Sequence, residues 1–209
     1  MIVVLFLPYN GNQNLWYEKI MAKKLSTYAK RRNVKRSKEP PAKVASSRGN
    51  PSFVVQQHAA RAMHYDLRLE VDGVMKSWAI PKGPSLNPQM RRLAVLTDDH
   101  PLSYKNFEGV IPKGEYGAGK VIVWDRGRYQ NIKKNKQGKP LTMKGAFRQG
   151  TIEIVLKGKK LKGAFALVRM SGKNWLLIKM KDAHADLRKN IVKSEPYSVK
   201  SGKKIQEIK

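Results

Sequence analysis

Short β-forming runs separated by turn signals fill most of the chain after residue 52, and they limit the folds open to it. Asp72-Gly73 lies between two of these runs and is a strong signal for a tight hairpin, and a second turn signal spans residues 171–174. About eight short strands with little helix predict a mainly β fold, a compact closed or nearly closed β-barrel. The expected strands cover residues 53–57, 64–71, 74–80, 93–97, 121–124, 151–156, 164–170 and 175–180.

The segments that flank these runs have different compositions. Residues 11–31 carry apolar side chains at mixed three- and four-residue spacing, which predicts one N-terminal amphipathic helix. Residues 38–52 are rich in Pro, Ser, Gly and Arg, so an irregular connection is expected there. We therefore expect an N-terminal extension with helix and basic linker (1–52), a barrel domain (53–185) and a basic, extended and flexible tail (186–209).

The charge balance indicates the kind of partner. Lys and Arg total 43 against 15 Asp and Glu, a formal net charge of +28, which favours nucleic acid over neutral or acidic partners. The chain has no cysteine, so thiolate metal sites, thiol nucleophiles and disulfides are excluded, as fits a cytoplasmic, nucleoid-associated protein. The apolar run at residues 1–7 lacks the pattern of a signal peptide and the length of a membrane anchor. We expect a monomer that does not bind membranes.

The run from His64 to Val71 alternates strictly between polar and apolar residues. His64, Asp66, Arg68 and Glu70 share one face of the expected strand, and the apolar residues between them share the face toward the core. Taken alone, such a polar face is most often an ordinary solvent-facing surface.

A second histidine changes this interpretation. His58, His64 and Asp66 follow the spacing H-x5-H-x-D, and the five residues between the histidines can loop His58 back toward the strand. Two imidazoles and a carboxylate suit Mn²⁺ or another divalent transition ion and leave positions open for water and substrate. Arg68 extends the same face and can fork onto a phosphate, so the pattern predicts phosphoester chemistry.

Other candidate residues are weaker on the sequence alone. His100 follows an expected strand in a turn-like stretch, where it could act as a phosphate ligand or a general acid. Tyr104, Lys82 and Arg92 are ambiguous, because a basic protein scatters such groups widely. His184 has no evident partner and is expected at the surface.

Two tempting motifs fail on inspection. Residues 114–120 have the glycine and lysine spacing of a P-loop, but Val121 replaces the required Ser or Thr and a strand follows instead of a helix. We interpret this stretch as a tight turn. In Glu70-Val71-Asp72-Gly73, Glu70 stands where a nucleotidyltransferase needs its adenylated lysine, which argues against a self-contained ligase.

Several stretches together resemble one known family, the 3′-phosphoesterase domain of bacterial DNA ligase D, of which this chain would be a free-standing member. The similarity runs from residue 28 to 182 or beyond. Its motifs include residues 53–58, 64–70, 77–84, 108–112, 114–119, 124–127, 167–169 and 175–179.

The resemblance implies a compact β-barrel that binds Mn²⁺ and removes a 3′-terminal ribonucleoside and then the remaining 3′-phosphate. The implied partners are DNA primer-templates with 3′-ribonucleotide or 3′-phosphate ends, and a separate ligase or polymerase of end joining. One departure is Asn33, where the family usually has an aspartate. The resemblance places metal ligands at His58, His64 and Asp66, phosphate contacts at Arg68, His100 and Tyr104, and supporting polar groups at Gln56, Lys82, Arg92, Arg32 and Glu39.

The alternative to an enzyme is a non-catalytic β-barrel that binds single-stranded nucleic acid by charge and stacking. That reading needs exposed aromatic platforms, for which Trp78, Trp124 and Tyr129 are the candidates. It leaves the His-His-Asp cluster without a role.

Overall fold

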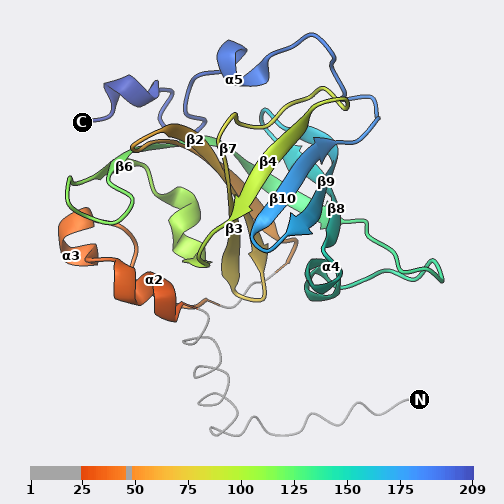
Figure 1. Ribbon diagram of the computed structural model, residues 1–209. Coiled ribbons are helices and arrows are strands. Elements are labelled where there is room, and N and C mark those ends of the chain that lie inside the picture. The colour runs from red at the N-terminus through yellow and green to blue at the C-terminus, as the bar shows by residue number, and fades with distance from the viewer. Residues whose placement is uncertain (1–24, 46–48) are drawn as a thin grey trace, which may run out of the picture.

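A computed structural model describes residues 25–45 and 49–209. Eight antiparallel strands form one closed barrel in the order β1-β2-β3-β4-β10-β9-β8-β7, and β7 pairs back with β1 to close it (Figure 1). This confirms the predicted barrel, and each expected strand overlaps an observed one. The barrel strands are β1 (Ser52–Ala59), β2 (Met63–Val71), β3 (Val74–Ile80), β4 (Arg91–Leu96), β7 (Gly119–Asn131), β8 (Thr151–Gly158), β9 (Lys162–Ser171) and β10 (Asn174–Lys179).

The predicted hairpin turns have the backbone geometry that their residues favour. Asp72 and Gly73 adopt φ angles of 47° and 80°, as a turn with two left-handed residues requires, and Val71 pairs with Val74 across it. Gly172 has a φ of 50° between β9 and β10. These turns fix the register of the strands that they join.

The barrel interior is a packed apolar core. The apolar face of β2 contributes Tyr65, Leu67, Leu69 and Val71, which confirms the alternation predicted for this strand. Indoles also fill the interior, and Trp78, Trp124 and Trp175 are all buried. A barrel filled in this way has no central channel, so a binding site must lie on its outer wall or at its ends.

The aromatic residues named as platforms for the binding-only alternative are buried. Trp78 and Trp124 have no exposed surface and Tyr129 is 2% exposed, so none of them can stack on a base. The Tyr129 hydroxyl donates to the Glu70 carbonyl and the Trp124 Nε1–H donates to the Glu195 carbonyl. They are core residues because strand alternation turns their rings inward.

A small second layer covers the outer face of β1 and β2. It consists of α2 (Ser26–Arg31), α3 (Val34–Ser37), the 3₁₀ helix η1 (Leu102–Asn106) and the short strands β5 (His100–Pro101) and β6 (Gly109–Ile111) (Figure 1). Tyr28, Tyr104, Phe107, Ile111 and Val121 form the apolar cluster that holds this layer in place. The polar face of β2 is therefore enclosed and not an ordinary solvent-facing surface.

The N-terminal helix expected over residues 11–31 is described only in part. Its C-terminal portion is helical as α2, and the remainder lies outside the described residues, as does the apolar run at 1–7. The described residues between α3 and β1 form neither helix nor strand, as predicted for this connection. Within the described part of the chain, no helix is both long and apolar enough to span a membrane.

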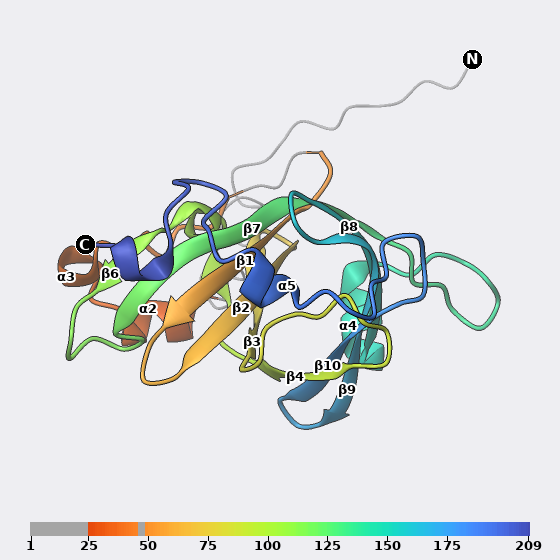
Figure 2. The same ribbon diagram turned by 90° about the horizontal axis from the view of Figure 1, so that it is seen from above.

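The C-terminal segment differs from the expected extended tail. Residues 186–209 run over the barrel and form α5 (Ile191–Ser194) and the 3₁₀ helix η2 (Ile205–Glu207) (Figure 2). Ile191, Ile205 and Ile208 are buried, and the Val199 N–H donates to the Val123 carbonyl. Each of these isoleucines is isolated among charged residues, so the composition of the segment does not indicate that they pack against the barrel.

A further helix, α4 (Met143–Gln149), was not expected from the sequence. Thr142 caps its N-terminus by accepting from the Gly145 N–H, and Gly150 ends it with a φ of 75°. Phe147 on this helix stacks on Trp175, with ring centroids 5.4 Å apart. The helix therefore packs against the core and lies apart from the predicted site residues.

Candidate metal centre and phosphate pocket

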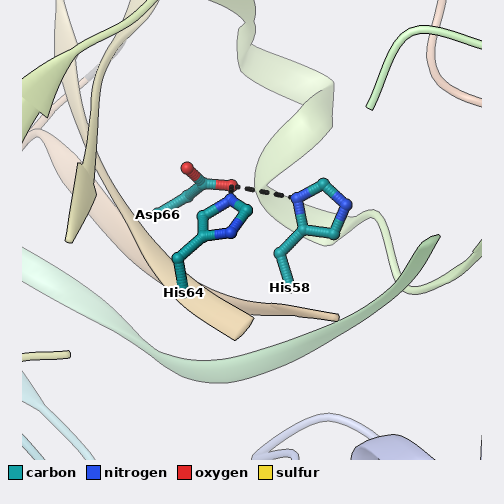
Figure 3. Close-up of side chains that lie close together, drawn as sticks. All are labelled: His58, His64 and Asp66. Atoms are coloured by element: carbon teal, nitrogen blue, oxygen red, sulfur yellow. Dashed lines mark ion pairs between the residues drawn. The ribbon is translucent and has the colours of Figure 1, made fainter. Parts of the chain in front are cut away.

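The three predicted metal ligands meet on the outer wall of the barrel. His58 and His64 are direct cross-strand partners in the β1–β2 hairpin, and their ring centroids are 4.7 Å apart. Asp66 Oδ2 lies 3.6 Å from His58 Nδ1 and 3.8 Å from His64 Nε2 (Figure 3). The potential ligand atoms of the three residues all lie within 4.8 Å of one another, which fits one shared metal ion.

Backbone carbonyls orient both imidazoles toward this point. His58 Nε2 lies 2.9 Å from the Gly117 carbonyl, and His64 Nδ1 lies 2.9 Å from the Ala62 carbonyl. Because a carbonyl only accepts, each of these nitrogens carries a proton. His58 Nδ1 and His64 Nε2 therefore face Asp66 and are the ring nitrogens available to a metal ion, the arrangement that metal-binding histidines usually show.

Arg68 is the hub of the polar network beside the metal centre. Its guanidinium donates to Gln56 Oε1 at 2.7 Å, to Ser77 Oγ at 2.9 Å and to Asp66 Oδ2 at 3.1 Å. The group is buried and lies over the Tyr104 ring at 4.8 Å. These contacts leave the guanidinium a single orientation.

The charges around Asp66 keep it ionised. Burial alone would raise the pKa of Asp66, but the Arg68 guanidinium and the two imidazoles hold that pKa well below its usual range. The carboxylate is therefore ionised at neutral pH and available as a metal ligand.

His100 packs against the other side of Arg68. Its Nδ1 lies 2.9 Å from Arg68 Nη1 and 2.8 Å from the Asp98 carbonyl. Its Nε2 is buried without a hydrogen-bond partner. Burial, aided by the positive charges of Arg68 and Arg32, holds the pKa of His100 well below its usual value, so the ring is neutral at pH 7.

We expect His100 to make the fold sensitive to acid. Because its folded-state pKa is depressed below the unfolded value of about 6.5, its contribution to stability is complete above that pH and is lost as the pH falls. His100→Gln should reduce the pH slope of the free energy of unfolding, by up to about 1.4 kcal/mol per pH unit, between about pH 6.5 and pH 5. Urea unfolding in excess chelator measures this slope. His184→Gln, at an exposed histidine, is the matched control, and an identical slope for the parent and His100→Gln would contradict the prediction.

The N-terminal layer supplies a second polar network. Glu39 is buried, accepts from the Tyr104 hydroxyl at 2.8 Å and pairs with Arg32 Nε at 3.0 Å. Burial, together with the charge of Glu39, raises the pKa of Tyr104 well above its usual value, against the opposing effect of Arg68, so this phenol stays protonated. The network ties the segment around α2 and α3 to the cavity.

These groups line one cavity of about 210 Å³ beside the candidate metal centre. Gln56 and Glu39 support it from behind through Arg68 and Tyr104. The lining residues are Arg32, His58, Ala60, His64, Asp66, Arg68, Ala79, Thr97, Asp98, His100, Tyr104, Tyr116 and Gly117.

Two predicted supporting residues lie elsewhere. Lys82 is exposed in the turn after β3, and Arg92 on β4 lines a separate hollow with Met90 and Leu187. Neither lines the metal cavity, so we assign them no contact with the reacting phosphate. Lys82 lies in a turn and Arg92 lies near the start of a strand, and neither position directs its side chain into the metal cavity.

Asn33 replaces the aspartate that was expected at its position. Its side chain caps α3 by accepting from the Arg36 N–H at 3.4 Å. Asparagine caps a helix about as well as aspartate, so the local structure is retained. What the substitution removes is a negative charge next to Arg32.

The glycine-rich stretch before β7 contributes more than the turn expected of it. It supplies the Gly117 carbonyl that orients His58, and it places Tyr116 on the cavity wall. A Cβ added at Gly119, whose φ is 145°, would lie 2.2 Å from the Ala59 carbonyl oxygen. Glycine at this position lets the loop approach β1 closely. In the sequence, the only signal for this loop was its glycine spacing, which partly matches a P-loop.

The protein is a closed antiparallel barrel with a candidate His-His-Asp metal site on its outer wall. The buried arginine beside this site suits the binding of an anionic ligand. A family model described as the DNA Ligase D 3′-phosphoesterase domain matches residues 56–169, more than half of the chain. The chain belongs to this family.

Curated relatives agree with this assignment. A multifunctional non-homologous end joining protein LigD from Pseudomonas aeruginosa is 43% identical over 188 residues, which cover 86% of this chain and 21% of the relative. A LigD from Mycolicibacterium smegmatis is 44% identical over 163 residues, covering 78% and 21%, and a multifunctional non-homologous end joining DNA repair protein LigD from Mycobacterium tuberculosis is 43% identical over 164 residues, covering 78% and 20%. The chain thus spans about a fifth of the length of these relatives.

Proposed function

We propose that this protein is a metal-dependent 3′-phosphoesterase that removes 3′-terminal ribonucleosides and 3′-phosphates from primer ends during end-joining repair. The observation that carries the proposal is the convergence of His58, His64 and Asp66 with Arg68 and His100 in one small cavity. A metal ion and fixed positive or donor groups both stabilise the charge on phosphate oxygens, and this cavity offers ligands for the first and supplies the second.

The donor set of two imidazoles and one carboxylate suits Mn²⁺ or a related divalent transition ion. His58 Nδ1, His64 Nε2 and one oxygen of Asp66 would hold it. When bound, such an ion supplies Lewis-acid polarisation of a phosphate oxygen.

The protein's own groups position the phosphate and neutralise its charge. Arg68 is fixed by Gln56 and Ser77, so its charge faces the cavity without reorganisation. We propose that His100 contacts a phosphate oxygen through Nε2, which is buried without a hydrogen-bond partner. A neutral ring suits this role as a ligand better than that of a general acid. Tyr104 has a positioning role, because its hydroxyl already donates to Glu39.

The basic surface would hold the duplex near the cavity without regard to sequence. We propose that the protein acts in the cytoplasm at the nucleoid, together with a separate ligase or polymerase of end joining. The missing charge at Asn33 would change the balance between the phosphatase and ribonuclease activities.

We expect cleavage of primers that end in one ribonucleotide or in a 3′-phosphate, and poor cleavage of an all-deoxy hydroxyl end. A deoxy end has neither a terminal dianion nor a 2′-hydroxyl for recognition. 5′-labelled primer-templates of the three kinds, incubated with and without Mn²⁺ across a salt series, measure this preference. Activity should require metal and should fall as salt rises. Equal cutting of all three ends, or activity unchanged in excess chelator, would refute the proposal.

A further inference from the structure

Tyr116 has a position that the proposed reaction leaves unused. It lies on the wall of the metal cavity and is 53% exposed. The next residue, Gly117, orients the metal ligand His58 through its carbonyl. Tyr116 is therefore one residue away from a direct contact of the candidate metal centre.

Two arginines hold the Tyr116 ring in place. The guanidinium carbon of Arg32 lies 4.6 Å from the ring centroid and that of Arg31 lies 5.1 Å from it. Arg31 also donates to the Tyr116 hydroxyl at 3.3 Å, and Arg32 donates to the Tyr116 carbonyl at 3.0 Å. Tyr116 remains 53% exposed with both guanidinium groups near its ring, so part of the side chain stays open to solvent.

Exposed aromatic rings are scarce near this cavity. The three tryptophans in the described residues are buried, and Tyr104, the other tyrosine on the cavity wall, is 2% exposed. Among the described Phe, Tyr and Trp residues, Tyr116 is thus the one exposed ring on the wall of the cavity. A fixed, exposed ring backed by guanidinium groups is the kind of surface on which a nucleobase stacks.

We infer that Tyr116 stacks on the base of the 3′-terminal nucleoside and so determines specificity for the diester step. The inference rests on the proposed function. In that step water attacks the phosphorus, the bond to the O5′ of the terminal nucleoside breaks, and a ribonucleoside leaves a primer with a 3′-phosphate. The second step releases only inorganic phosphate. A group that holds the terminal base therefore acts on the first step and has nothing to hold in the second.

The test compares both steps in Tyr116→Ala, Tyr116→Phe and the parent. The kcat/KM for release of the terminal ribonucleoside, divided by the kcat/KM for release of phosphate, should fall by about 10- to 100-fold in Tyr116→Ala, the range expected for loss of one stacked base. Tyr116→Phe should keep the parent ratio. Tyr197→Ala is the matched control, because Tyr197 is 47% exposed and carries Lys204 over its ring at 5.2 Å but does not line the metal cavity.

A primer that ends in an abasic ribose isolates the contact to the base. The parent should cleave it more slowly than a normal ribonucleotide end, and Tyr116→Ala should cause no further loss on it, because the stacking partner is already missing. Equal losses in both steps would show that Tyr116 only supports Arg32 and would overturn the inference, as would a parent-like ratio in Tyr116→Ala. If the parent cleaves neither substrate, the proposed function fails instead, and the two failures are distinguishable.

Discussion

Alanine at His58, His64 or Asp66 is expected to remove metal binding and to lower both phosphoesterase activities by about 10³-fold or more, since the metal contributes several kcal/mol to transition-state stabilisation. The three ligand atoms converge on one point, and each residue supplies a single donor. No neighbouring side chain in the described part of the cavity offers a replacement imidazole in the same place. Titration calorimetry with Mn²⁺ and cleavage of a 3′-phosphate primer measure the two effects.

The same three variants should differ in stability. His64 makes one hydrogen bond, to the Ala62 carbonyl, and its side chain is partly exposed, so His64→Ala should leave the fold nearly unchanged. Asp66→Ala should destabilise the protein by about 3–5 kcal/mol, because it leaves the buried charge of Arg68 without its partner. His184→Ala is the surface control. Metal binding like that of the parent in all three variants would disprove the ligand assignment.

Arg68→Ala is expected to have the second large effect, on both stability and activity. It removes four side-chain hydrogen bonds, to Gln56, Ser77, His100 and Asp66, and leaves Asp66 buried beside a cavity, which should cost about 3–5 kcal/mol. Activity should fall by about 10²–10³-fold, as after loss of one preorganised oxyanion donor. Arg68→Lys keeps the charge but loses the fork, so it should regain only part of either property.

A double variant tests the structural role of Arg68 as the ion-pair partner of Asp66. Asp66→Asn with Arg68→Met removes both buried charges together, and it should be more stable than either single variant while remaining inactive. Urea unfolding and steady-state kinetics on the 3′-phosphate primer measure the two properties. Arg188→Ala, at an exposed arginine, is the control. Full activity in Arg68→Ala would exclude this guanidinium from the reaction.

The strands were predictable because their signals are local. The alternation from His64 to Val71 and the turn at Asp72-Gly73 fix a hairpin within about twenty residues, and the structure has this hairpin with the expected faces. The grouping of the candidate metal ligands was predictable for the same reason. His58, His64 and Asp66 all lie on one hairpin, so the pairing of β1 with β2 is sufficient to bring them together.

Contacts between distant segments were beyond local signals. The exposure of Tyr116 beside the metal centre depends on the packing of the loop before β7 against Arg31 and Arg32, which are more than 80 residues away. The hydrogen bond from the Tyr104 hydroxyl to Glu39 also joins distant segments. The resemblance named both residues, but it did not predict this contact.

Composition did not reveal the burial of two groups of side chains. The segment 186–209 is so basic that it resembled a flexible tail, but Ile191, Ile205 and Ile208 each find an apolar site on the barrel. Trp78 and Trp124 were candidate platforms for base stacking, but both are buried inside the barrel. In both cases the burial of a side chain depends on contacts made in the complete fold, and the residue type alone does not predict those contacts.

By itself, the sequence determined the barrel strands, the hairpin turns, the basic character and the grouping of His58, His64 and Asp66, because each depends on residues close together in the chain. The tertiary structure decided which polar groups share the cavity. It brought Arg32, His100 and Tyr116 into the cavity beside the candidate metal centre and left Lys82 and Arg92 out of the lining of that cavity. The physical reason is that β1 pairs with β7 and the N-terminal layer packs over β2 only when the barrel closes, and this closure sets the distances between segments far apart in the chain.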